Sequence, residues 1–416
     1  ESKAFGADTA NCWTSTGADG YTLEPCDKAD CGTVITLHLK ENTEEENYDE
    51  FLEPYRIQGL VKKYSDYIRY PIIMQMSHQV PNPDKEGETV TEVADETLNS
   101  MVPLWRKAKS ELKPEDYNAF YKQRFGDYED PVDVMHFKTE GQATFDALLY
   151  IPKNPPFDYY TKEFEKGLAL YSNGVLIMEK CPDLLPDHFS FVRGLIDSAD
   201  LSLNISREML QHDHQLKIIA KAINRKIKNE LTRMLKNERE KYEAFFKTFG
   251  VQLKFGVYAN YGAEKDDLKD LLLFRSSAGE GMVTLKEYVD GMAEGQDTIY
   301  YACGDTAEKI ALLPQTDAVL SKGYQVLYLT DDVDEFALQM LMEYDGKKFA
   351  NITKDDLNLE SEDEKKAMEQ KNADAKGLLD TMKEALGEEV SAVKFSGNLG
   401  SHAVCLSAEG YLSMEM

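Results

Sequence analysis

The stretch Ser202-Leu-Asn-Ile-Ser-Arg-Glu-Met-Leu-Gln211 closes an apolar segment and opens a long predicted helix. Ser206 is placed to cap that helix, because its hydroxyl can accept a hydrogen bond from a free N–H of the first turn. Arg207 then lies in the first turn, where the positive end of the helix dipole disfavours an arginine. A guanidinium in that position can bind a phosphate with two hydrogen bonds. The alternative is an ion pair with Glu208 or Asp200, and spacing alone favours it, because structural ion pairs are common.

The chain around this stretch alternates predicted strands and helices, which indicates layered α/β domains. Before the stretch, residues 142–151 and 168–178 are each predicted to form one strand. After it, a helix is predicted from Glu208 to about Lys241. Its apolar residues recur at three- and four-residue spacing: Leu216, Ile219, Ile223, Ile227, Leu231 and Met234. A βαβ unit with parallel strands is predicted from Asp297 to Leu329.

Three further segments are predicted from local patterns. Residues 32–39 alternate in a way that is typical of a strand, with one face formed by Ile35, Leu37 and Leu39. Residues 81–88 are rich in proline, glycine and charge, which is typical of a linker or a hairpin tip. A charged helix is predicted from Glu360 to about Leu386, and two short strands are predicted between Ser391 and Ser407.

Composition limits the class of protein. A chain of 416 residues suggests two or three domains, and its net charge of −28 argues against a nucleic-acid partner. No apolar run approaches the roughly 20 residues of a membrane span, and Glu1-Ser-Lys-Ala does not resemble a signal peptide. The six cysteines are too few for a disulfide scaffold and lack zinc-site spacing. We therefore expect free thiols in a reducing cytoplasm and no metal site.

Leu203-Asn-Ile-Ser-Arg-Glu-Met-Leu-Gln211 resembles the catalytic loop in the middle domain of the ninety-kilodalton heat-shock chaperones, of the bacterial HtpG type. The resemblance runs from about Cys31 to the C-terminus. Further segments carry it in the same order: Lys63-Tyr-Ser-Asp-Tyr67, Pro103-Leu-Trp105, Tyr117-Asn-Ala-Phe-Tyr121, Glu140-Gly-Gln142, Leu149-Tyr-Ile-Pro152, Phe191-Val-Arg-Gly194 and Ile299-Tyr-Tyr301. One departure is Tyr171-Ser-Asn-Gly174, where many relatives have an arginine.

The resemblance implies a multi-domain α/β fold with α+β layers. It divides the chain into four regions: residues 1–78 as the end of the N-terminal ATP-binding domain, 79–100 as a short linker, 101–358 as the middle domain, and 359–416 as a truncated C-terminal domain. The middle domain is expected to have α/β/α layers, with a large α/β unit to about residue 240 and a smaller α/β unit over about 250–358. The helices that form the homodimer in the family are expected to be missing.

The resemblance also implies roles in ATP chemistry. Arg207 corresponds to the arginine that reaches the γ-phosphate of ATP held by the N-terminal domain, and Gln211 is the glutamine that ends the same catalytic motif. Thr33 corresponds to a threonine of the adenine pocket, although an ordinary strand threonine fits the sequence at least as well. The other pocket residues of the family have no counterpart in the chain. The intact protein is therefore expected to be a slow ATPase that uses ATP and Mg²⁺, whereas this chain alone should bind neither and be inactive.

Partly folded client proteins are the partners that the resemblance implies. The acidic and aromatic pair that contacts clients in bacterial relatives corresponds to Glu335 and Phe336. Apolar client contacts near the C-terminus correspond to Leu412 and Met416. The family pair is often Glu-Trp and the first C-terminal position is often Met, but both changes keep an apolar surface. The alternative is a buried Phe336, since an aromatic residue on a helix is more often in the core.

Two other classes of protein stay open. One is a non-enzymatic acidic scaffold of stacked α/β units. The other is a different member of the same ATPase superfamily, such as a mismatch-repair or topoisomerase subunit. Those proteins use a lysine from the second domain and bind DNA, which neither Arg207 nor the charge of −28 supports. An ATP-binding domain encoded upstream in the same reading frame would favour the chaperone over the scaffold.

Overall fold

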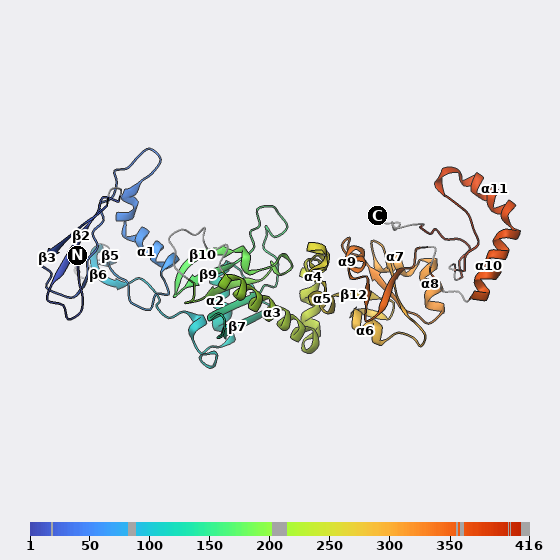
Figure 1. The fold of residues 1–416 in the computed structure, drawn as a ribbon, viewed down its shortest axis with the longest axis horizontal. Coiled ribbons are helices and arrows are strands. Elements are labelled where there is room, and N and C mark those ends of the chain that lie inside the picture. Colours follow the sequence, from blue (N-terminus) through green and yellow to red (C-terminus); the bar gives the residue numbers. More distant parts are fainter. Residues whose placement is uncertain are drawn as a thin grey trace. The chain divides into compact units, whose positions relative to one another are not determined.

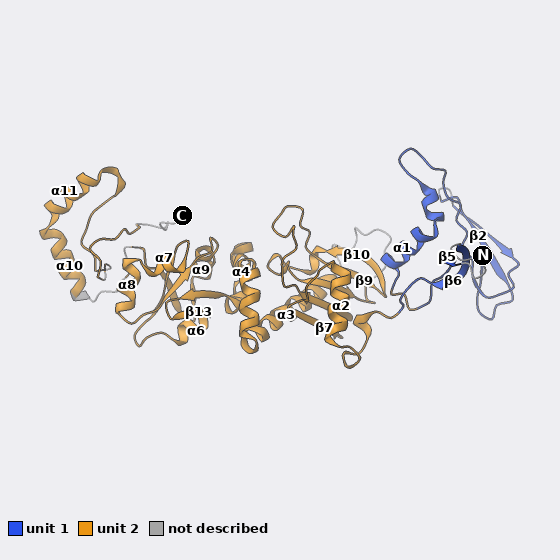
Figure 2. Cartoon of the chain, turned by 180° about the vertical axis from the view of Figure 1, so that it is seen from behind, with its two compact units in different colours: residues 1–66, 70–101 blue, residues 67–69, 102–416 orange. Residues whose placement is uncertain are grey.

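The computed structural model describes residues 1–17, 20–81, 89–201, 214–354, 357, 362–397, 399 and 401–408. The chain divides into two compact units, which are residues 1–66 with 70–101 and residues 67–69 with 102–416 (Figure 2). Helices and strands alternate along the chain, as the labels of Figure 1 show. This mixture confirms the predicted α/β fold class.

In its described residues, the first unit has two antiparallel sheets and one α-helix. Its four-stranded sheet has the order β3-β2-β1-β4, from β1 (Ser2–Lys3), β2 (Ala10–Thr14), β3 (Thr22–Cys26) and β4 (Gly32–Thr33). Helix α1 (Pro54–Tyr64) begins with a proline, whose fixed φ suits the first helical position. Strands β5 (Ile73–Pro81) and β6 (Thr89–Thr97) pair along their whole length. Residues 82–88 of the predicted linker or hairpin tip lie outside the described residues, so this prediction stays open.

The strand predicted over residues 32–39 is shorter than expected. β4 ends at Thr33, and residues 34–43 carry no regular structure. Ile35 and Leu37 are 77% and 78% exposed. Alternation alone did not produce a longer strand, because β4 pairs only with the two-residue strand β1.

The second unit begins with helix α2 (Pro114–Phe125) and a five-stranded sheet. The sheet has the order β10-β9-β11-β8-β7, from β7 (Asp133–Thr139), β8 (Phe145–Ile151), β9 (Leu168–Ser172), β10 (Val175–Cys181) and β11 (Arg193–Asp197). β9 and β11 are parallel, and the other neighbours are antiparallel. β8, β9 and β11 are largely buried, and β11 lies between β9 and β8.

Residues 168–178 do not form the single strand that their apolar run predicts. They form parts of β9 and β10, which pair as an antiparallel hairpin. Asn173 and Gly174 make the turn with φ values of 52° and 82°, the combination that tight hairpin turns favour. A Cβ at Gly174 would lie 2.3 Å from the backbone oxygen of Tyr67, so the turn has room only for glycine there.

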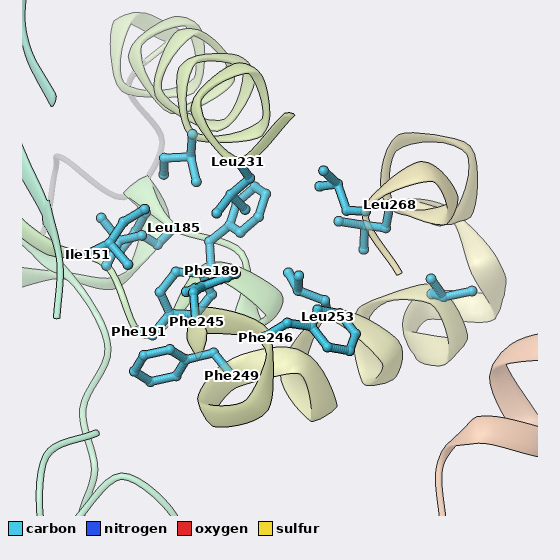
Figure 3. Packing of buried hydrophobic residues seen from close by; sticks show 14 of the residues in the cluster. Ile151, Leu185, Phe189, Phe191, Leu231, Phe245, Phe246, Phe249, Leu253 and Leu268 are labelled. Atoms are coloured by element: carbon cyan, nitrogen blue, oxygen red, sulfur yellow. The ribbon is translucent and has the colours of Figure 1, made fainter. Parts of the chain in front are cut away.

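Two long helices, α3 (His214–Asn237) and α4 (Arg239–Gly262), join the same apolar core as this sheet. α3 buries the six predicted residues, which confirms its apolar face: Leu216, Ile219, Ile223, Ile227, Leu231 and Met234. The helix ends four residues earlier than predicted, and Glu238 separates it from α4 by accepting hydrogen bonds from Arg233 and Lys241. In Figure 3, Phe245 of α4 lies against Phe189 and Phe191 in this core.

A six-stranded sheet follows, in the order β13-β12-β15-β14-β17-β16. Its strands are β12 (Leu273–Ser276), β13 (Gly279–Thr284), β14 (Thr298–Cys303), β15 (Val326–Leu329), β16 (Glu343–Tyr344) and β17 (Lys347–Asn351). The accompanying helices are α5 (Lys265–Leu268), α6 (Leu285–Asp290), α7 (Ala307–Ala311), α8 (Pro314–Ser321) and α9 (Asp334–Leu341). β14 and β15 are parallel, with α7 and α8 between them in the chain, which confirms the predicted βαβ unit.

The charged helix predicted near the C-terminus is divided into α10 (Glu362–Asp374) and α11 (Lys376–Leu386). The two strands predicted between Ser391 and Ser407 are wrong for the part of that segment that the structure describes. The pairing in this region is an isolated bridge between Lys354 and Ala408.

Candidate functional site

The seven predicted site residues divide into two groups. Three lie in described parts of the chain: Thr33, Glu335 and Phe336. Four lie outside the described residues: Arg207, Gln211, Leu412 and Met416. The residues that flank the Arg207 stretch are described, and they show how the chain enters and leaves it.

β11 leads toward the Arg207 stretch and ends on a buried carboxylate. Asp197, its last residue, has a fully buried side chain. It accepts hydrogen bonds from Trp105 Nε1 (3.0 Å) and from the N–H of Gly174 (3.2 Å), and Arg106 Nη2 lies 2.7 Å from it. Burial of a carboxylate is tolerated only where such donors replace water. Asp197 therefore ties the end of β11 to the β9–β10 turn and to the segment that carries Trp105.

Aromatic packing fixes Trp105, which is one of the donors to Asp197. The ring of Trp105 is buried, with its centroid 4.5 Å from that of Tyr67 and 5.3 Å from that of Tyr171. A ring nitrogen of His136, Nε2, is hydrogen-bonded to the backbone oxygen of Trp105 at 2.9 Å. Rings in such tilted and edge-on contacts stabilise one another beyond their burial. Trp105 is thus fixed on both its backbone and its side chain.

Hydroxyl groups hold the chain from β11 up to the stretch itself. Ser198 Oγ donates to the backbone oxygen of Thr144 (2.7 Å), and the N–H of Thr144 donates to Asp200 Oδ2 (2.7 Å). Ser172 Oγ donates to the backbone oxygen of Leu201 (2.9 Å), where both residues are buried. The backbone is therefore anchored at Leu201, directly before Ser202. Asp200, one alternative partner for Arg207, already accepts a backbone N–H.

On the far side of the stretch, α3 fixes the chain again. The helix is described from His214, and its first buried side chains are Leu216 and Ile219. Both ends of the stretch that carries Arg207 are therefore attached to one apolar core. A catalytic group needs such support, because misplacement by about 1 Å can cost 10²-fold in rate.

Glu335 and Phe336 are neighbours in α9 with different surroundings. Glu335 is only 5% exposed, and its carboxylate accepts hydrogen bonds from Tyr301 Oη (3.1 Å) and Asn351 Nδ2 (3.2 Å). Burial, and then the Glu335 charge, raise the pKa of the Tyr301 hydroxyl. Phe336 is 40% exposed, and its ring centroid lies 5.7 Å from that of Tyr258. Of the predicted pair, the aromatic residue is at the surface, so the alternative of a core Phe336 is wrong.

Thr33 lies in the short strand β4 and is exposed. Its hydroxyl is hydrogen-bonded to that of Ser2 at 2.9 Å. This contact belongs to the pairing of β1 with β4 and does not test a contact with nucleotide. The role of Thr33 in an adenine pocket stays a prediction.

The described residues contain neither a metal-binding cluster nor a membrane-spanning helix. Within them, no three His, Cys, Asp or Glu side chains come together to hold a metal ion. No helix in the same parts of the chain combines the length and the apolar character needed to cross a bilayer. All six cysteines are free thiols.

The chain matches a protein-family model over most of its length. The family model described as "Hsp90 protein" matches residues 78–416, which is well over half of the chain. The chain belongs to the Hsp90 family. This confirms the family suggested by the resemblance.

Relatives in the Hsp90 family are similar over almost the whole chain. The chaperone protein HtpG of Clostridium perfringens strain 13 is 57% identical over 415 residues, and that of Bacillus subtilis strain 168 is 54% identical over 415 residues. The chaperone protein HtpG of Oceanobacillus iheyensis is 53% identical over 414 residues. Each match covers 100% of this chain and 66% of the relative. The chain thus spans 66% of the length of the curated relatives it matches.

A buried ion pair in this Hsp90-family chain was not predicted from its sequence. Lys254 Nζ lies 2.6 Å from Asp334 Oδ1 and 2.8 Å from Asp331 Oδ2, between α4 and the start of α9. Burial raises the pKa of Asp334, and the charge of Lys254 opposes that change. The sequence feature that could have indicated this pair is a lysine placed between Leu253 and Val257, two core residues of α4. Lys254 therefore helps to fix the helix that carries Phe336.

Proposed function

We propose that the chain is part of an ATP-dependent chaperone that binds partly folded client proteins. Membership of the Hsp90 family and the printed name of the relatives support this function. The structural observation that carries the proposal is the anchor at Leu201, which supports the stretch with Arg207 on a buried network centred on Asp197.

The proposed nucleotide step uses a guanidinium from this stretch. Arg207 contacts the γ-phosphate of ATP that the N-terminal domain holds together with Mg²⁺, and Gln211 acts from the same motif. Negative charge on the transferred phosphoryl group is stabilised by a positioned cation. Thr33 would contribute to the adenine pocket of that domain. Arg207 therefore acts on nucleotide, and the anchored backbone supplies its position.

The proposed client surface centres on Phe336. Partly folded proteins expose apolar side chains, and exposed apolar patches on a folded protein are suited to cover them. Phe336 and Tyr258 form such an exposed aromatic pair. Leu412 and Met416 are proposed as further apolar contacts. Glu335 is buried, and we propose that it acts by holding Tyr301 and Asn351 beneath this surface.

We propose the following organisation for the intact protein. Residues 1–78 belong to the ATP-binding domain, 79–100 to the linker, 101–358 to the middle domain and 359–416 to the C-terminal domain. The change of compact unit after Met101 supports the second of these boundaries. The protein is proposed to be a homodimer in the cytoplasm, where a reducing environment suits its six free thiols.

Aggregation of a thermally unfolded test protein measures client binding. We expect the chain to suppress aggregation at equimolar concentration. Phe336→Ser should lower the suppression by at least about half, because it removes an exposed apolar side chain. Tyr128→Ser, at another exposed aromatic residue, should leave it unchanged. Equal effects of the two substitutions, or no suppression by the chain, would contradict the proposed client surface.

A further inference from the structure

A cavity of about 380 Å³ lies at the first sheet of the second unit. Its walls come from the end of α2, the connection around residues 156–167, and strands β9, β10 and β11. The three predicted site residues that the structure describes, Thr33, Glu335 and Phe336, do not line it. Its volume is within the range of sites that bind small ligands or peptide ends.

Two arginines line this cavity. Arg124 comes from the last turn of α2, and Arg193 comes from the first residue of β11. In the described part of the chain, no acidic side chain forms an ion pair with either of them. The guanidinium carbon of Arg193 lies 5.7 Å from the ring centroid of Phe125, which also lines the cavity. This stacking orients the guanidinium and leaves its N–H groups available for an anion.

The other cations of the cavity already have acidic partners. Lys166 Nζ lies 2.6 Å from Asp187 Oδ1, and Lys180 Nζ lies 3.9 Å from Glu165 Oε2. Among the described residues, the two arginines lack such an ion pair, although Arg193 also interacts electrostatically with the nearby Asp127 carboxylate. Asp158 and Glu179 also line the cavity. A dense polyanion would meet these acids, whereas a single carboxylate can contact the arginines alone.

The floor of the cavity is apolar. Phe191 and Val192 line it from the core and are each only 1% exposed, so the apolar surface that a ligand can contact comes from the half-buried rings of Phe125 and Phe164. Phe164 lies in the connection between β8 and β9. A ligand that carries its carboxylate next to an apolar group can contact the arginines and these rings together.

We propose that the cavity binds the carboxyl terminus of a polypeptide whose last side chain is apolar. Arg124 and Arg193 take the terminal carboxylate, and the last side chain packs against the half-buried ring of Phe164. The carboxylate of Asp158, which lines the cavity, can accept a peptide N–H, which a terminal residue provides. A small apolar carboxylic acid shares the carboxylate and the apolar group but has no peptide N–H. The proposal does not depend on the proposed chaperone function.

Binding of three probes to the 416-residue chain tests the proposal by titration calorimetry. The probes are acetyl-Ala-Ala-Leu-Phe as the free acid, the same peptide as its amide, and 3-phenylpropionate. We expect saturable binding of the acid peptide and at least about ten-fold weaker binding of the amide, because a charged acceptor is lost. We also expect about ten-fold weaker binding of 3-phenylpropionate. Equal binding of acid and amide, or of the acid peptide and 3-phenylpropionate, would overturn the proposal, as would no saturable binding of the acid peptide up to 10 mM.

Substitutions locate the binding. Arg124→Ala combined with Arg193→Ala should weaken binding of the acid peptide by at least about ten-fold. Arg193→Lys keeps the charge but removes the planar fork, so it should also weaken binding. Lys162→Ala, an exposed residue of the same connection that does not line the cavity, is the matched control and should change nothing. Unchanged affinity in a folded double variant would overturn the proposal. If the double variant does not fold, the comparison of acid with amide on the natural chain still decides.

Discussion

Asp197 brings three separate parts of the second unit together, because its carboxylate faces donors from Trp105, Arg106 and Gly174. Alanine at this position would leave the buried N–H groups of Trp105 and Gly174 without an acceptor, and Arg106 without its anion. We predict that Asp197→Ala lowers the free energy of unfolding by about 3–5 kcal/mol. Urea unfolding of the chain measures this loss. Asp332→Ala, at an exposed carboxylate, is the control and should change stability by less than about 0.5 kcal/mol. Equal stability of the two variants would contradict the role given to Asp197.

His188 gives a second prediction at the scale of one residue. Its ring is buried, and burial lowers its pKa from 6.5 to about 4. The unfolded chain therefore binds a proton that the folded chain does not, between about pH 6.5 and pH 4. The stability that a neutral His188 contributes is present above pH 6.5 and is lost as the pH falls through about 4, by at most about 3 kcal/mol.

The substitution His188→Gln separates the contribution of His188 to the pH dependence of stability from that of the carboxylates, which titrate in the same pH range. Unfolding free energies measured between pH 7 and pH 4 should fall less steeply for His188→Gln than for the natural chain. The carboxylates are the same in both proteins, so the difference between the two curves reports His188. Parallel curves would show that His188 is protonated in the folded protein.

At the scale of elements, α4 and α9 are joined by the buried pair of Lys254 with Asp334. We predict that Lys254→Met costs about 3–5 kcal/mol at pH 7, because it leaves the buried carboxylate of Asp334 without its cation. The pKa of Asp334 is already raised by burial and should rise further in the variant. The folded variant would then hold a proton that the unfolded chain releases, so its stability should fall as the pH rises above about 4.

Urea unfolding of the natural chain, of Lys254→Met and of Lys254→Met with Asp334→Asn tests this pairing. The asparagine still accepts hydrogen bonds from the N–H groups of Thr330 and Asp331, which Asp334 Oδ2 accepts in the natural chain. The double variant should therefore recover part of the loss and no longer depend on pH in this way. A double variant that is less stable than the single variant would contradict this explanation.

Elements that bury one face could be predicted from sequence. The spacing from Leu216 to Met234 predicted the buried face of α3. A helix that packs against a core has apolar residues at three- and four-residue intervals, so the sequence of the helix alone indicates which face is buried. The hairpin of β9 and β10 was missed, since its apolar run continues on both sides of Asn173 and Gly174. The turn was encoded in those two residues, whose types suit positive φ.

The environment of the candidate site was harder to predict than its residues. Glu335 was predicted to contact clients from the start of a helix, but it is buried against Tyr301 of β14 and Asn351 of β17. Asp197 likewise draws its donors from segments distant in sequence. Such partners are set by the packing of whole sheets, which local pattern does not contain.

At the scale of the whole molecule, the resemblance to a known family predicted more about this protein than its composition did. The charge of −28 argued only against nucleic acid as a partner, whereas collinear motifs predicted the Hsp90 family that the family model confirmed. Membership of the Hsp90 family argues against the alternative of a mismatch-repair or topoisomerase subunit. A purely scaffolding role differs from the proposed ATPase in one testable respect, which is the chemistry of Arg207.

ATP turnover with and without Arg207 therefore tests the central proposal most directly. The protein for this test joins the chain to the ATP-binding domain of the family, and Arg275→Ala, at an exposed arginine on β12, is the control. We predict that Arg207→Ala lowers turnover by about 10³-fold or less, with an unchanged dissociation constant for ATP. In the 416-residue chain the same substitution should leave the melting temperature unchanged or slightly raised, because it relieves about 0.3–1 kcal/mol at the predicted helix start. Unchanged turnover, together with a melting temperature lower by several degrees, would show that Arg207 is a structural ion-pair residue.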